Sequence, residues 1–139
     1  MSRHYNIDYQ RTHDIDWFFK FNNRCFHIAS NCGVIPSIID ISDNRNLQFE
    51  IANLEEVSDA IFVIDNSEGL DLSSFEEYAK KGFISLDRVD GDFESNHYFV
   101  VAVPKKGKQP PKSIVEKIPE MDVGKLGDIV GGVEYIYDV

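Results

Sequence analysis

Side chains that branch at the β-carbon constrain the fold of this chain more than any other feature. Isoleucine and valine together number 27 of the 139 residues, whereas alanine and leucine together number 11. Branched side chains lose rotamer freedom in a helix and pack well on the pleated surface of a sheet. The sequence therefore predicts a protein built mainly from β-strands, and its length suits one domain over residues 1–139.

Short segments with alternating or continuous apolar residues mark the expected strands. Residues 14–21 place Trp17 and Phe19 on one face, and Asn22 and Asn23 then suit a tight turn because asparagine tolerates a positive φ. The returning strand is expected over residues 24–30. Six further strands are expected over residues 37–41, 47–52, 60–64, 83–89, 97–103 and 133–139. Residues 60–64 and 97–103 are apolar on both faces, which predicts a central position for the first and the deepest burial for the second.

Two short helices complete the expected architecture. The first is expected over residues 73–81, where Ser73 and Glu76 form a capping-box pattern. The second is expected over residues 113–118, ending before Pro119. Because the strands are joined by connections of hairpin length, the sequence favours an α+β fold with a mostly antiparallel sheet of about six to eight short strands, on which one or two helices pack.

Two segments are expected to lie outside this packed unit. Residues 105–112 are rich in lysine and proline and predict an exposed basic connection. Residues 119–132 contain several glycines and predict a loose segment.

The chain is strongly acidic, with 24 acidic and 14 basic residues and a net charge of -10. Residues 1–104 hold 18 acidic and 8 basic side chains, whereas residues 105–139 hold six of each. Such a chain repels phosphate backbones, which argues against nucleic acid as a partner. An acidic surface instead favours a partner protein with a basic surface.

No segment predicts membrane insertion or secretion. The longest apolar run, residues 98–103, is far shorter than the roughly 20 residues that span a bilayer. The N-terminal residues contain no apolar stretch of the kind found in signal peptides. We therefore expect a cytoplasmic protein in which Cys25 and Cys32 are free thiols.

Two groups of carboxylates and one aromatic side chain are the candidate binding residues. In the first expected strand Phe18 lies on the polar face with Asp14 and Asp16, which predicts an exposed aromatic side chain that contacts a partner. A second acidic cluster falls in a predicted hairpin turn. The candidates are Asp14, Asp16, Phe18, Asp90, Asp92 and Glu94.

A cysteine and two histidines offer an alternative site. Cys25 and His27 are two residues apart, so on a strand they point to the same face, and His97 is a third polar group for a pocket. A catalytic thiolate would also need an orienting group and an oxyanion site, and neither is evident around Cys25. The spacing matches no structural zinc pattern, and no phosphate-binding loop or dinucleotide fingerprint is present, so no metal or cofactor is expected.

These observations predict a small acidic domain that binds a partner protein without catalysis. Its size and charge are similar to those of toxin-neutralising immunity proteins, whose carboxylates mask a basic nucleic-acid-binding cleft; this is an analogy of composition only. Two alternatives stay open. One is a ligand-binding or enzymatic pocket built on Cys25, His27 and His97, and the other is a domain that self-associates into a homo-oligomer through a sheet face or edge.

Overall fold

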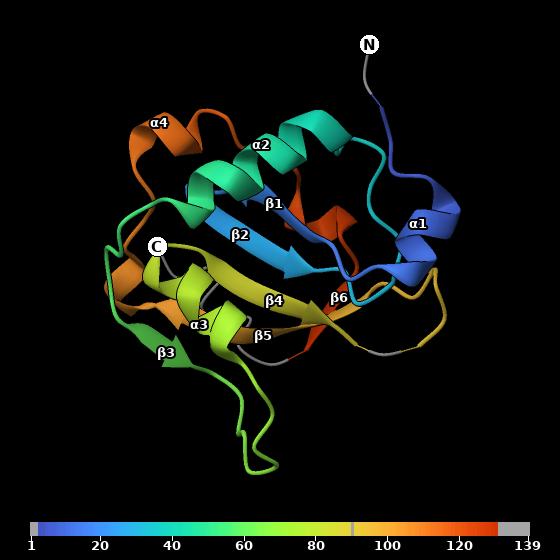
Figure 1. The fold of residues 1–139 in the computed structure, drawn as a ribbon. Helices are drawn as coiled ribbons and strands as arrows, with labels where there is room; N and C mark the ends of the chain where they lie inside the picture. Colours follow the sequence, from blue (N-terminus) through green and yellow to red (C-terminus); the bar gives the residue numbers. More distant parts are fainter. Residues whose placement is uncertain (1–2, 90, 131–139) are drawn as a thin grey trace.

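A computed structural model describes residues 3–89 and 91–130 of the chain. Over these residues the chain forms a six-stranded sheet and four α-helices, which confirms the α+β class (Figure 1). The helices are α1 (Ile7–Thr12), α2 (Ile41–Ala52), α3 (Ser73–Lys80) and α4 (Lys112–Val115). The strands are β1 (Asp16–Phe21), β2 (Arg24–Ala29), β3 (Ala60–Phe62), β4 (Ile84–Arg88), β5 (His97–Pro104) and β6 (Asp128–Val130).

The sheet is mixed, so the expected antiparallel arrangement holds for only three of its five strand pairs. Its strand order is β1-β2-β4-β5-β3, and β6 also pairs with β5. Three pairs are antiparallel, but β2 pairs with β4 and β5 pairs with β6 in parallel. Between β2 and β4 the chain runs through α2, β3 and α3, and this long connection returns it to its original direction. The β1/β2 hairpin is confirmed, since Asn22 and Asn23 have φ values of 51° and 61°.

Both faces of the sheet are covered, and different parts of the chain cover them. On the first face, which we call the helical face, α2, α3 and α4 pack over Phe18, Phe83 and Val101 (Figure 1). On the opposite face, residues around α1, the connection after β2 and residues 121–129 pack over Trp17 and other large side chains. Period-two alternation distinguishes the two faces of a strand, but it does not show whether one of them meets water.

Helix α2 replaces the strand expected at residues 47–52, and the strand expected at 37–41 is also absent, because residues 37–40 form a turn and the cap that precede the helix. Asp40 caps it by accepting a hydrogen bond of 3.0 Å from the Asp43 backbone N–H. Asn44, Leu47 and Ile51 are buried, and their spacing of three and four residues is that of one helix face. The alternation that suggested a strand also includes Phe49, which is 73% exposed.

Strand β3 lies at the edge of the sheet, so the central position expected for residues 60–64 is wrong. Ile61 and Phe62 are 39% and 43% exposed. Strand β5 is largely buried, as expected, but β2 is the strand in which all six residues are buried.

The segment expected to be loose is packed against the sheet as far as residue 130. Val123 and Leu126 are buried, and β6 pairs with β5. Lys20 donates its backbone N–H to Pro119, and Met121 donates its own to Lys20, so this segment covers part of the outer edge of β1. Of the segment expected to be exposed, residues 105–109 are exposed but Pro110 is buried, and the strand expected at 133–139 falls outside the described residues.

Candidate binding surface

Residues 46–79, which we call the acidic segment, have the most uneven charge distribution in the chain. They contain nine aspartate and glutamate residues and no lysine, arginine or histidine. They form the second half of α2, the connection to β3, β3 itself, the following loop and most of α3. The lack of basic residues in this segment can be seen in the sequence, but the net charge counted over residues 1–104 does not show it.

Six carboxylates of the acidic segment are exposed and form no ion pair with any described residue. Three others are paired: Glu50 with Lys117 at 2.6 Å, and Glu76 and Glu77 with lysines one helical turn further along α3. The six without an ion pair are Glu55, Glu56, Asp59, Asp65, Glu68 and Asp71. We call them the unpaired carboxylates.

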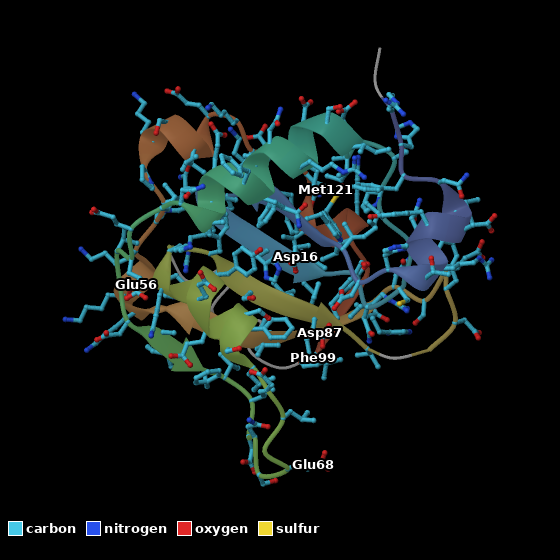
Figure 2. The ribbon with its side chains drawn as sticks, viewed as in Figure 1. Asp16, Glu56, Glu68, Asp87, Phe99 and Met121 are labelled. Atoms are coloured by element: carbon cyan, nitrogen blue, oxygen red, sulfur yellow. The ribbon has the colours of Figure 1, made fainter. Side chains whose placement is uncertain are left out.

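The unpaired carboxylates lie on the two connections that flank β3, three before the strand and three after it. Glu56 lies on the flank beside α3, and Glu68 lies at the tip of the loop that projects below β3 (Figure 2). The hydrogen bond and charge of Glu76 raise the pKa of Lys80 above its ordinary value, and the negative charges of Glu56 and Asp59 add to this effect. A concentration of negative charge of this kind attracts cationic partners and disfavours anionic ones.

Apolar side chains are exposed among these carboxylates. Of the nine large apolar side chains that are exposed in the described part of the chain, five belong to the acidic segment: Phe49, Val57, Ile61, Phe62 and Leu70. Apolar anchors surrounded by charged side chains are typical of protein interfaces.

The backbone of β3 adds unsatisfied hydrogen-bonding groups to this surface. Val63 donates its N–H to Val101, and the Asp59 carbonyl accepts the N–H of Lys105, so the odd-numbered residues face β5. In an antiparallel pair the intervening residues face the other way. The N–H and C=O groups of Ala60 and Phe62 therefore point to the outer edge, where no described residue bonds to them.

A buried polar cluster lies under the helical face. His27 is fully buried; its Nε2 lies 2.7 Å from Asp16 Oδ1 and its Nδ1 lies 2.7 Å from Ser85 Oγ. Tyr78 stacks on the imidazole with ring centres 3.8 Å apart, and its hydroxyl donates to Asp16 over 3.4 Å. Burial and the Asp16 carboxylate raise the pKa of the Tyr78 hydroxyl. The Asp16 side chain is one-third exposed between α2 and α3 (Figure 2).

A serine, a histidine and an aspartate in one hydrogen-bonded chain are also the parts of a hydrolase site, but access differs here. Ser85 and His27 are fully buried, so no substrate reaches the hydroxyl. The cluster satisfies polar groups inside the sheet and fixes the positions of the strands and α3.

The three residues proposed for the alternative pocket lie in two distant parts of the structure. Cys25 and His27 share the helical face, as expected, and burial raises the pKa of the Cys25 thiol to about 11, so it is protonated at neutral pH. His97 lies at the start of β5, where its side chain is 54% exposed and lies 3.4 Å from Asp128. The structure does not bring these three residues together.

The candidate binding residues are also separated. Phe18 is fully buried against His27, Tyr78 and Phe83, so the expected exposed anchor is wrong. The carboxylate of Asp16 bonds to His27, as described above.

Three of the remaining candidates lie at the end of the sheet where β1 begins and β4 ends. Asp14 is exposed there and accepts the Asn31 backbone N–H. Asp92 and Glu94 are exposed in the loop after β4, and Asp90 falls outside the described residues.

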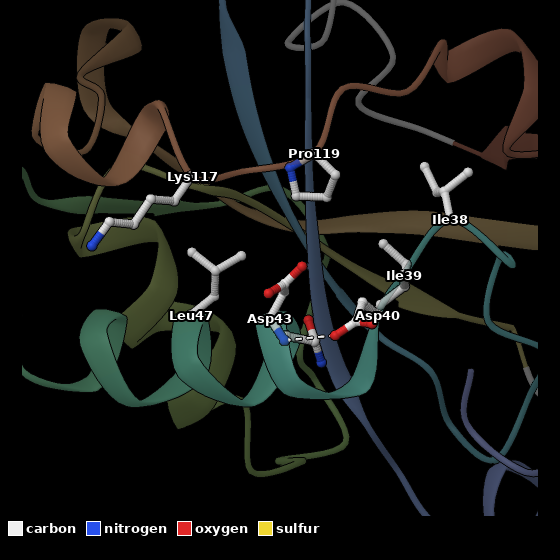
Figure 3. Close-up of a pocket in the computed structure, with 8 residues that line it drawn as sticks. Ile38, Ile39, Asp40, Asp43, Leu47, Lys117 and Pro119 are labelled. Atoms are coloured by element: carbon white, nitrogen blue, oxygen red, sulfur yellow. Dashed lines mark hydrogen bonds between the residues drawn. The ribbon is translucent and has the colours of Figure 1, made fainter. Parts of the chain in front are cut away.

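A small pocket lies between α2 and residues 117–119 (Figure 3). Its volume of about 90 Å³ is well below the roughly 300 Å³ of sites for drug-sized ligands. Its Asp40 carboxylate is already engaged as the cap of α2, and the backbone N–H groups of Asp43 and Arg3 lower the pKa of that carboxyl. The pocket is lined by Ile38, Ile39, Asp40, Asp43, Asn44, Leu47, Lys117 and Pro119.

Searches for other kinds of site, and for related proteins, return no assignment. In residues 3–89 and 91–130, no group of three or more histidine, cysteine, aspartate or glutamate side chains is placed to hold a metal ion. No helix formed by these residues has the length and apolarity to cross a membrane. Comparison with protein-family models, curated proteins and solved structures finds no match.

Proposed function

We propose that this protein is a non-catalytic binding domain that recognises a basic surface of a partner protein through the acidic segment. The observation that carries the proposal is the absence of any basic residue from 46 to 79, along a segment that also exposes five large apolar side chains. Charge directs the encounter and excludes anionic partners, while the apolar side chains supply contact area.

A non-catalytic role is supported by the burial of the reactive side chains. Ser85 and His27 are inaccessible, and the Cys25 thiol is held in its protonated form. A protein with a basic nucleic-acid-binding cleft is a partner of the proposed kind, because carboxylates lining a masking domain replace the phosphates of the nucleic acid.

A selection from a displayed library of random peptides tests the proposal on the full chain. Peptides retained by the wild-type protein are expected to carry a net positive charge together with apolar residues. A charge-reversed variant, in which four unpaired carboxylates become lysine, should lose these peptides, with affinity falling by about tenfold or more. The four changes are Glu55→Lys, Glu56→Lys, Asp65→Lys and Glu68→Lys.

A control variant tests whether binding depends on the position of the negative charges or only on the net charge of the protein. It carries the same number of exposed carboxylate-to-lysine changes outside the acidic segment, at Asp8, Asp92, Glu94 and Glu116. It should retain the selected peptides with a modest loss of association rate. Enrichment of neutral or acidic peptides, or equal loss in both variants, would contradict the proposal.

A further inference from the structure

We infer that the outer edge of β3 binds an extended basic segment of the partner as an additional strand of the sheet. This inference rests on the proposed function and specifies how the acidic segment binds. Addition of a strand to an exposed sheet edge obtains affinity from main-chain hydrogen bonds and specificity from side chains on the two faces.

The two edges of the sheet differ in what covers them. At β1, residues 119–121 bond to Lys20, and the Asn44 side chain donates to the Asp16 carbonyl over 2.9 Å. At β3, the outward groups of Ala60 and Phe62 bond to no described residue. Apart from its short length of three residues, β3 has none of the usual protections of an exposed edge, since Ala60, Ile61 and Phe62 include no lysine, proline or bulge.

The side chains of β3 define what the added strand must carry. Val63 packs on the face opposite the helices and Ile64 packs on the helical face. Because side chains alternate along a strand, Ile61 shares the face of Val63 and Phe62 lies on the helical face. Both are exposed, and an added strand places one side chain beside each of them. The matching segment therefore has two consecutive apolar residues.

The carboxylates on either side of β3 favour basic residues flanking that apolar pair. Asp59 and Asp65 flank the strand, and Glu68 and Asp71 lie on the loop that follows. Two copies of β3 placed edge to edge would bring these carboxylates against a second acidic surface, which like-charge repulsion opposes. The charge therefore favours a basic segment over a second copy of this chain.

A designed peptide of about eight residues tests the inference. The probe has the sequence Lys-Lys-Thr-Val-Val-Thr-Lys-Lys with blocked ends, and a matched peptide carries N-methyl groups on both valine amides. Affinities are measured by calorimetry, and hydrogen exchange of the full chain is followed residue by residue. The probe should bind about tenfold more tightly than its N-methylated form, because in either register one of the two valine amides faces the β3 edge and methylation removes that donor.

Hydrogen exchange identifies the edge directly. In the free protein, the amides of Ala60 and Phe62 should exchange fast while that of Ile61 exchanges slowly; with the probe bound, Ala60 and Phe62 should become protected. Protection of Ala60 and Phe62 in the free monomer would overturn the inference, because the edge would already be covered. Concentration-dependent protection without the probe would overturn it in favour of a second copy.

The outcomes distinguish the mode of binding from the proposed function. If both peptides bind equally and the charge-reversed variant binds neither, the acidic segment recognises basic partners but not by strand addition. If neither the probe nor any basic peptide from the library binds, both statements fail.

Two protein variants supply an independent test. Ala60→Pro removes an outward N–H and leaves the Ile61–Val103 pair in place, so it should weaken the probe while preserving the fold. Phe62→Lys should abolish measurable binding, whereas Phe49→Lys, at an exposed position on α2, should reduce it far less. Equal effects of the two phenylalanine variants would contradict the inference.

Discussion

Removal of the Asp16 carboxylate should destabilise the fold through the buried imidazole of His27. The His27 Nε2–H donates to Asp16 over 2.7 Å, and the ring is fully buried. In Asp16→Ala this donor loses its partner, and an unsatisfied buried donor costs about 1–3 kcal/mol. Because the Asp16 side chain is one-third exposed, water enters the vacated space and offsets part of that penalty.

We therefore expect Asp16→Ala to lower the free energy of unfolding by about 2 kcal/mol and Tm by about 8 °C. Ser85→Ala, which removes a neutral partner from Nδ1, should lower it by about 1 kcal/mol. The assay is urea denaturation followed by the fluorescence of Trp17, the single tryptophan, which is fully buried.

A surface carboxylate provides the control for this experiment. Asp92 is exposed, and Asp92→Ala should change stability by about 0.5 kcal/mol or less. The two cluster variants share one imidazole ring, so their effects should not be additive in the double variant. The reasoning is refuted if Asp16→Ala unfolds at the same urea concentration as Asp92→Ala.

Three further predictions concern the backbone, the thiols and acid stability. A Cβ at Gly33 would clash with the side chain of Arg88, whose guanidinium donates to four backbone carbonyls. Gly33→Ala should therefore lower the free energy of unfolding by about 3 kcal/mol, and an unchanged midpoint of urea denaturation would contradict this. With the Cys25 pKa raised to about 11 by burial and Cys32 exposed, one thiol should react rapidly with a disulfide reagent at about pH 8, and Cys32→Ser should show no fast phase. The backbone N–H groups of Asp43 and Arg3 lower the pKa of the Asp40 carboxyl below 3.8. The stability that the ionised Asp40 contributes is therefore complete above pH 3.8 and is lost as the pH falls through the lowered pKa. In Asp40→Asn the stability difference from wild type should shrink between about pH 4 and pH 2, and a constant difference would contradict the assignment.

Local patterns predicted the parts of the fold that local chemistry determines. The Asn22-Asn23 turn closes the β1/β2 hairpin because asparagine accepts a positive φ, and α3 forms where charged pairs and an apolar stripe coincide. Helix α2 was missed because Leu47, Phe49 and Ile51 also satisfy a period of two. The deciding facts are the cap at Asp40 and the exposure of Phe49, and exposure depends on tertiary packing.

The site residues depend on long-range contacts that the sequence does not show. Phe18 shares its face of β1 with the polar residues Asp16 and Lys20, but helices cover that face, so the Phe18 ring is buried. The parallel β2/β4 pair brings Ser85 beside His27 across 58 positions of sequence, and no local motif records it. The acidic segment, by contrast, was visible in the sequence as a long interval without a basic residue.

An NMR titration of the full chain tests the central claim most directly. The ligand is the tightest basic peptide from the library selection, added at about 0.15 M salt and again at about 1 M, where exposed charges are screened. The account predicts shift changes concentrated in residues 53–72 that largely disappear at high salt. Changes centred on Asp14, Asp92 and Glu94, or changes that are insensitive to salt, would contradict it.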